Sequence, residues 1–173
     1  MFDKLLNLFS PQRKIRPKDP IRASADLRGL ILHMKPEQIN VSRSSEIPNV
    51  WGVMMEIGMG GAVVTVVSLA DGTTSMYFSS GGGIIGAGQH EEVALASKMF
   101  IGAAERCLEL IPQSIACPMP AQGNVRFHLL TFDGYRSVEN VENEIQKPSH
   151  PLYRIYESGQ WVITKVRMRT EKQ

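Results

Sequence analysis

The chain has few of the features that crosslink a fold or anchor it in a membrane. Its 173 residues include only two cysteines, Cys107 and Cys117, which are too few for a disulfide framework. No apolar run approaches the roughly 20 residues that span a bilayer. The N-terminus lacks the basic region and long apolar stretch of a signal peptide. We therefore expect a cytoplasmic protein of bacterial type without a transmembrane segment.

The net charge is also small. The formal net charge is +2, with 43% hydrophobic and 21% charged residues. This composition is typical of a soluble globular protein, and the charge is too small to indicate a nucleic-acid partner. The length suits one domain. We predict an amphipathic helix and basic linker in residues 1–20, followed by a single domain in residues 21–173.

Residue patterns in the first half of the domain predict one helix and three strands. Asp19 and Pro20 can cap and start a helix that runs to residue 34. Strand-like runs cover residues 50–57, 62–70 and 73–78. Asp71-Gly72 lies between two of them and predicts a two-residue hairpin with a type I′ turn.

The second half begins with a helical pattern over residues 90–111, followed by strands at 125–132 and 135–139 that flank a second hairpin signal, Asp133-Gly134. Residues 140–149 read as a polar loop. Residues 152–167 fit either a helix or a hairpin turning at Ser158-Gly159, and we favour the helix. The fold class is therefore α+β: a five-stranded antiparallel sheet in a β-β-β-α-β-β-α core, with helices packed on it and an N-terminal helical extension.

The densest feature is a glycine-rich loop at residues 79–88, which contains five of the 15 glycines. A strand, a glycine loop and a helix start can present backbone N–H groups to an anion. The P-loop spacing is missing, and Glu91 and Glu92 in the first helical turn would repel a phosphate. We favour a structural corner. An anion, nucleotide or hydrolytic site stays open, as does an interaction surface at Ile84 and Ile85. The candidate ligand-binding residues are Ser79, Ser80, Gly81, Gly82, Gly83, Gly86, Gly88, His90, Arg126 and His128.

Catalytic and metal motifs are not apparent. The four histidines, His33, His90, His128 and His150, lack ligand spacing, so no metal and no cofactor is expected. His90 reads as a helix cap or an exposed residue. Arg126 and His128 share one strand face by two-residue alternation. That face could form a small polar site, although a solvated sheet face is the favoured interpretation.

The N-terminal segment carries a second candidate site for a partner. Phe2, Leu5, Leu6 and Phe9 recur at helical spacing, and a basic, proline-punctuated stretch follows at residues 11–20. Weak peripheral contact with an anionic membrane is one interpretation. An apolar groove on the chain's own domain or on a second copy is the favoured one. We therefore expect a protein partner or self-association.

Two stretches, residues 71–88 and 129–134, resemble segments of uncharacterised bacterial proteins. That resemblance implies a bacterial origin and a shared fold, but no activity. The order of strands and helices also loosely resembles profilin-like and roadblock-type interaction domains. The sequence thus favours a non-enzymatic interaction or regulatory domain over a small-ligand or hydrolytic site at residues 79–90.

Overall fold

The computed structural model describes residues 19–170, so the expectations for residues 1–18 lie outside the described part of the chain. The domain opens with helix α2 (Pro20–Leu32) and the short helix η2 (Pro36–Ile39), followed by strands β1 (Val50–Met59), β2 (Ala62–Leu69), β3 (Thr74–Phe78) and β4 (Gly83–Ile84). Next come η3 (Ala87–Gln89), α3 (Glu91–Arg106), η4 (Leu108–Leu110), β5 (Asn124–Thr131), β6 (Gly134–Val141), α4 (Glu142–Ile145) and α5 (Tyr153–Thr170).

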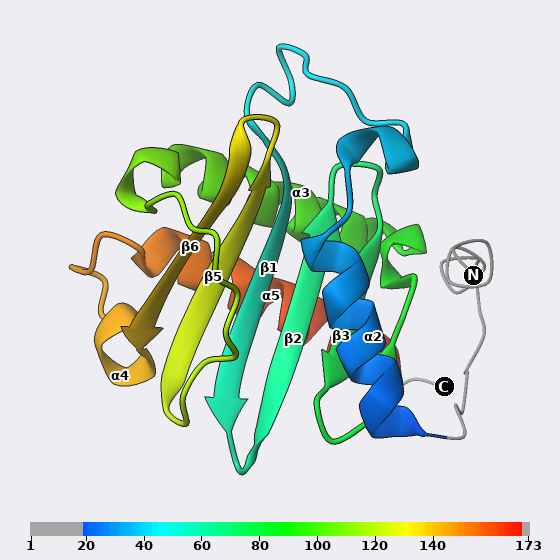
Figure 1. The fold of residues 1–173 in the computed structure, drawn as a ribbon, viewed down its shortest axis with the longest axis vertical. Coiled ribbons are helices and arrows are strands. Elements are labelled where there is room, and N and C mark those ends of the chain that lie inside the picture. The colour runs from blue at the N-terminus through cyan, green and yellow to red at the C-terminus, as the bar shows by residue number, and fades with distance from the viewer. Residues whose placement is uncertain (1–18, 171–173) are drawn as a thin grey trace.

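The strands form one antiparallel sheet in the order β4-β3-β2-β1-β5-β6. Helices α3 and α5 cover one face of this sheet, and α2 lies across the opposite face (Figure 1). Side chains alternate between the two faces, which builds two separate apolar cores. The larger core lies under α3 and α5 around Phe100 and Phe127, and the smaller lies under α2 around Trp51 and Met54. The α+β class is thus confirmed.

The sheet has six strands, so the expectation of five was wrong. The additional strand, β4, lies within the glycine-rich loop and pairs with the edge of β3, where Met76 is opposite Ile84 and Tyr77 is opposite Gly83. The chain reverses there because the Phe78 N–H donates to the Gly82 carbonyl and the Gly81 N–H donates to the Phe78 carbonyl. A two-residue strand leaves no periodicity to detect in a sequence.

The turn at Asp71-Gly72 differs from the predicted type I′ geometry. Such a turn needs positive φ at both central residues, but only Gly72 has it, with a φ of 92°. The Leu69 N–H donates to the Thr73 carbonyl, so residues 70–72 form a three-residue loop. The Asp71 carboxylate accepts from the Thr73 backbone N–H at 2.8 Å and from its hydroxyl at 2.9 Å. This local ring holds the aspartate out of the left-handed region.

The C-terminal segment forms helix α5, which resolves the choice between helix and hairpin. Gly159, the turn residue of the alternative hairpin, lies inside this helix, and its packing explains the glycine. A Cβ at this position would lie 2.6 Å from the Met55 methyl and 3.2 Å from the Phe100 ring. Glycine therefore lets α5 approach both β1 and α3 closely.

Two other expectations are corrected by the structure. The polar loop expected at 140–149 contains the end of β6 and helix α4. The helix predicted at 90–111 ends at Arg106, before η4.

Candidate functional site: a buried polar row beneath helix α2

Polar side chains cross the α2-facing side of the sheet in a single row. The pairing register places Tyr77 opposite Thr65, Thr65 opposite Glu56, Glu56 opposite Arg126, and Arg126 opposite Glu139. Directly opposed residues in antiparallel strands have Cβ atoms about 4.5–5.5 Å apart, so these five form a continuous band. We call them the polar row. The sequence patterns do not predict the centre of this row, Glu56. Its only signal in the sequence is a single carboxylate among the apolar residues of β1.

Glu56 is fully buried and is held from both sides. Arg28 of α2 donates to its two carboxylate oxygens, from Nε at 2.7 Å and from Nη2 at 2.8 Å. The buried His128 lies with Nε2 2.8 Å from the second oxygen, and the Thr65 hydroxyl donates to the first at 3.4 Å. Arg28 also donates to the carbonyls of Cys117 and Pro118, at 2.8 and 3.2 Å. One guanidinium therefore fastens both α2 and the 112–123 segment over the sheet.

The charges of this cluster follow from its burial and its partners. Burial alone would raise the pKa of Glu56, but hydrogen bonds from His128 and Arg28 outweigh it and lower that pKa. Burial lowers the pKa of His128 more than the carboxylate restores it, so the imidazole is neutral. A neutral ring whose Nε2–H donates to Glu56 leaves Nδ1 to accept from the Tyr135 hydroxyl, which it contacts. Glu56 and Arg28 therefore form a neutralised ion pair.

Lowering the pH should reduce the stability of the fold, because the buried His128 resists protonation. Its pKa is lowered in the folded chain, so its contribution to stability is complete above the ordinary histidine pKa of 6.5 and is lost as pH falls from there toward the lowered value. The Glu56 contribution is lost only below about pH 4.5. We expect the free energy of unfolding, measured by urea titration, to fall between pH 6.5 and 5 by at most about 1.4 kcal/mol per unit.

His128→Gln should flatten this pH dependence, whatever its effect on stability at pH 7.5. His90→Gln is the matched control, because His90 is only half-buried and no side-chain hydrogen bond caps α3 there. Equal slopes for the wild-type protein and His128→Gln would contradict the assignment.

A second ion pair closes the outer end of the row. Arg126 contacts the carboxylate of Glu139, which also accepts from the Asn124 amide at 2.7 Å and from the Ala121 backbone N–H at 3.0 Å. Burial works against ionisation of Glu139, but these donors outweigh it and lower its pKa. Gly58 allows the covering segment to approach, since a Cβ there would lie 2.2 Å from the Ala121 carbonyl oxygen.

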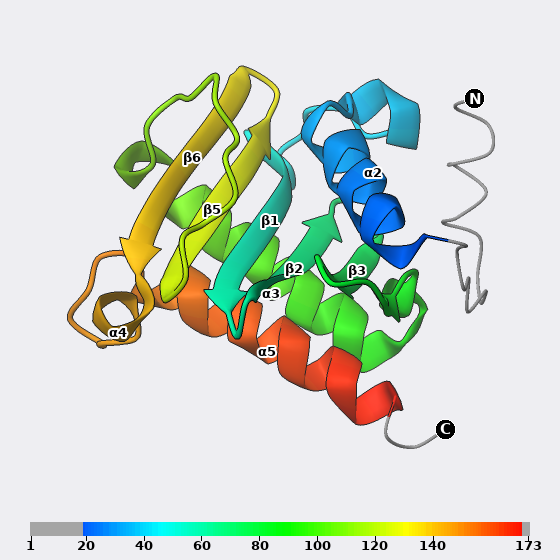
Figure 2. The same ribbon diagram turned by 60° about the horizontal axis from the view of Figure 1, so that its bottom comes forward.

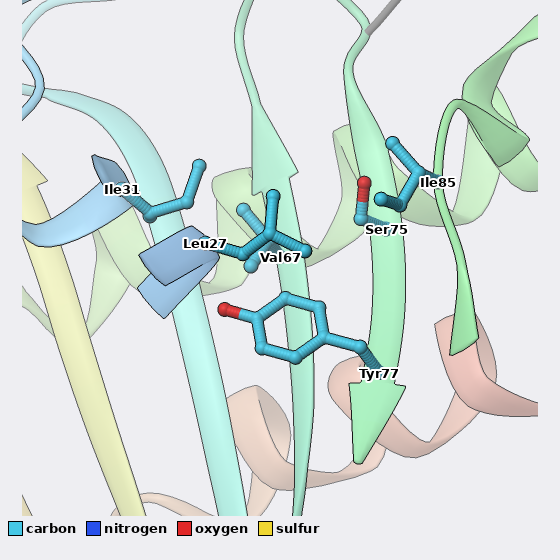
Figure 3. Close-up of a pocket in the computed structure, with 6 residues that line it drawn as sticks. All are labelled: Leu27, Ile31, Val67, Ser75, Tyr77 and Ile85. Atoms are coloured by element: carbon cyan, nitrogen blue, oxygen red, sulfur yellow. The ribbon is translucent and has the colours of Figure 1, made fainter. Parts of the chain in front are cut away.

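A narrow hollow separates α2 from the sheet beside the row (Figure 3). Its walls are Leu27, Ile31, Val67, Ser75, Tyr77 and Ile85, and it has no room for a water molecule. Within the described residues, the buried hydroxyls of Ser75 and Tyr77 make no hydrogen bond of normal geometry, although Tyr77 faces Thr65. Burial raises the pKa of Tyr77 far above its usual range, so its hydroxyl stays protonated. The Tyr77 end of the row is thus covered by α2.

The glycine-rich loop forms the corner where β3 turns toward α3. Gly81 lies beneath Pro20, and Gly83 lies against the backbone of Met76 and Tyr77. Ser79 ties the corner together, since its hydroxyl accepts from the Val63 N–H at 2.8 Å and its carbonyl accepts from the Ser24 hydroxyl at 3.4 Å. Ser80, Gly82 and Gly83 are exposed, whereas Gly86, Gly88 and His90 are partly buried.

The candidate ligand-binding residues of the glycine-rich loop do not lie near those on β5. The loop lies at the β3–β4 edge of the sheet, whereas Arg126 and His128 lie on β5, with β2 and β1 between. The face bearing Arg126 and His128 is covered by α2 and the 112–123 segment, and His128 is fully buried, so the favoured interpretation of a solvated face was wrong. Ile84 and Ile85 are half-buried and pack against the α3–α5 core and the α2 core respectively.

Among residues 19–170, no group of three or more histidine, cysteine or acidic side chains could hold a metal ion. In the same part of the chain, no helix is long and apolar enough to cross a membrane. Comparison with known proteins found no matching family model, no matching curated protein and no matching solved structure. The function must therefore be inferred from the surfaces of the molecule.

Proposed function

We propose that the protein is a non-enzymatic interaction domain that self-associates through the outer face of α3 and α5. The observation that carries this proposal is a set of large apolar side chains on that face, each 41–60% exposed: Leu95, Met99, Trp161 and Met168. We call these four residues the α3–α5 surface. Both helices lie side by side against the same face of the sheet (Figure 2).

Ion pairs between the two helices place these residues in one patch. Glu92 of α3 lies 3.1 Å from Arg169 and 3.6 Å from Lys165 of α5, so the helices run antiparallel. The Lys165 ammonium lies 4.7 Å from the centre of the Trp161 ring. Residues three or four positions apart are neighbours on a helix. Leu95 therefore follows Glu92 on α3, while Trp161 and Met168 flank Lys165 on α5.

The α3–α5 surface is not needed to cover the core. The opposite sides of the two helices already do so with other residues, such as Val93, Phe100, Ile155 and Val162. Contiguous exposed apolar residues mark docking sites, and tryptophan and methionine are enriched in interfaces. In a two-fold dimer each copy presents the same α3–α5 surface to the other, so one patch on the chain serves both copies.

The rest of the molecule supports this proposal over a small-ligand site. Arg28, Glu56 and His128 take one another as partners beneath α2, and the glycine-rich loop packs against Pro20 and the backbone of β3. A binding function is therefore best placed on the layer of α3 and α5, which presents four large exposed apolar side chains.

Sedimentation velocity over a range of concentrations tests the proposal. We expect a dimer, and Met99→Asp should weaken self-association by about tenfold or more, because a charge would be buried without a partner. Ile115→Asp is the control, since Ile115 is fully exposed on the 112–123 segment, away from α3 and α5. A wild-type protein that stays monomeric at every concentration would contradict the proposal, as would equal weakening by both variants.

A further inference from the structure

We infer that residues 1–9 of one copy bind the α3–α5 surface of the other, so that two copies exchange N-terminal segments. This inference rests on the proposed self-association. The segment has apolar residues at Phe2, Leu5, Leu6 and Phe9, which is the i, i+3, i+4, i+7 pattern by which a helix fills a groove. The antiparallel helix pair offers exposed apolar residues from both helices to such a segment, Leu95 and Met99 from α3 and Trp161 from α5.

The contact area favours exchange over a bare contact between the two helical layers. Stable interfaces bury about 1,200–2,000 Å² in total. The α3–α5 surface alone contributes four side chains per copy that are already about half covered. Two exchanged segments would add four phenylalanines, and at about 150–250 Å² for each buried aromatic side chain these supply roughly 600–1,000 Å². Exchange therefore brings the contact to the size that a stable dimer needs.

The start of the described chain is placed for this exchange. Asp19 caps α2, and Pro20 lies against Gly81 at the β3–β4 edge. That edge lies at the same end of the molecule as the first turn of α3 and the last turn of α5 (Figure 2). Residues 10–18 can span at most about 30 Å, which is enough to pass from this edge to a neighbouring copy.

Disulfide cross-linking between differently tagged chains tests the exchange. One chain carries Leu6→Cys, the other carries Leu95→Cys, and both carry Cys117→Ser to remove the partly exposed native thiol. Mild oxidation of the mixture should give a covalent dimer containing both tags. Asn7→Cys in place of Leu6→Cys is the matched control, because it is adjacent in sequence but lies off the apolar pattern, and it should cross-link about tenfold less.

The possible outcomes separate this inference from the proposed function. A single chain carrying Leu6→Cys and Leu95→Cys that closes a disulfide within a monomer overturns the exchange, because the segment then binds its own domain. Equal yields from Leu6→Cys and Asn7→Cys overturn it as well. If sedimentation still shows a dimer that Met99→Asp weakens, the proposed function stands without the exchange; if sedimentation shows only monomer, both fail.

Discussion

Replacing Glu56 with leucine is expected to lower the free energy of unfolding by about 3–5 kcal/mol, the usual cost of breaking a buried ion pair from one side. The carboxylate is fully buried, and the side chain of Arg28 is only 13% exposed. Without Glu56, the guanidinium keeps only the carbonyls of Cys117 and Pro118, and the Nε2–H of His128 loses its acceptor. Urea titration at pH 7.5 measures the loss.

The double variant Arg28→Leu/Glu56→Leu separates loss of the pair from loss of packing. Because it removes both charges, it should be more stable than Glu56→Leu alone. Glu139→Leu is the comparison at the rim of the row, where the carboxylate is 22% exposed, and its cost should be smaller. A Glu56→Leu protein within about 1 kcal/mol of wild type would show that the row contributes little to folding.

Gly88→Ala is the second change with a large expected effect. A Cβ on Gly88 would lie 1.9 Å from the carbonyl oxygen of Gly72, so two backbone segments would have to separate. Overpacking of this kind costs about 1–3 kcal/mol, and a clash with backbone should reach the upper end. The two glycines join the β2–β3 turn to the start of α3, which positions the helix on the sheet. A thermal melt, checked by urea titration, measures the effect.

Gly102→Ala is the matched control, because a Cβ there meets only the end of the flexible Arg106 side chain, at 3.6 Å. Gly102 lies within α3, so alanine should stabilise the helix by about 0.5–1 kcal/mol. A Gly88→Ala protein as stable as Gly102→Ala would contradict the close approach of the two backbones.

The regular elements were predictable because each repeats a pattern over many residues. Strands β1, β2 and β5, helix α3 and the cap of α2 at Asp19 all lie where periodicity and capping placed them. The errors fall where structure depends on a few local hydrogen bonds. The turn at Asp71 is set by its carboxylate, and β4 is only two residues long. Neither produces a repeat that a sequence pattern could reveal.

The candidate site was less predictable because its pairs are distant in sequence. Alternation along β5 placed Arg126 and His128 on one face, but it could not show that this face lies under α2. Arg28 and Glu56 are 28 positions apart, and Glu56 and His128 are 72 apart. Only the crossing of α2 over β1, and the pairing of β1 with β5, bring these three side chains together.

The fluorescence of Trp161 tests the central claim most directly. Trp161 is 47% exposed in the single chain, whereas Trp51 is 2% exposed, so a change in acrylamide quenching on self-association reports on Trp161. If the α3–α5 surface is the contact, dilution from micromolar to nanomolar protein should increase quenching in parallel with dissociation of the dimer seen by sedimentation. A dimer that dissociates while quenching stays constant would contradict the account, because Trp161 would then lie outside the interface.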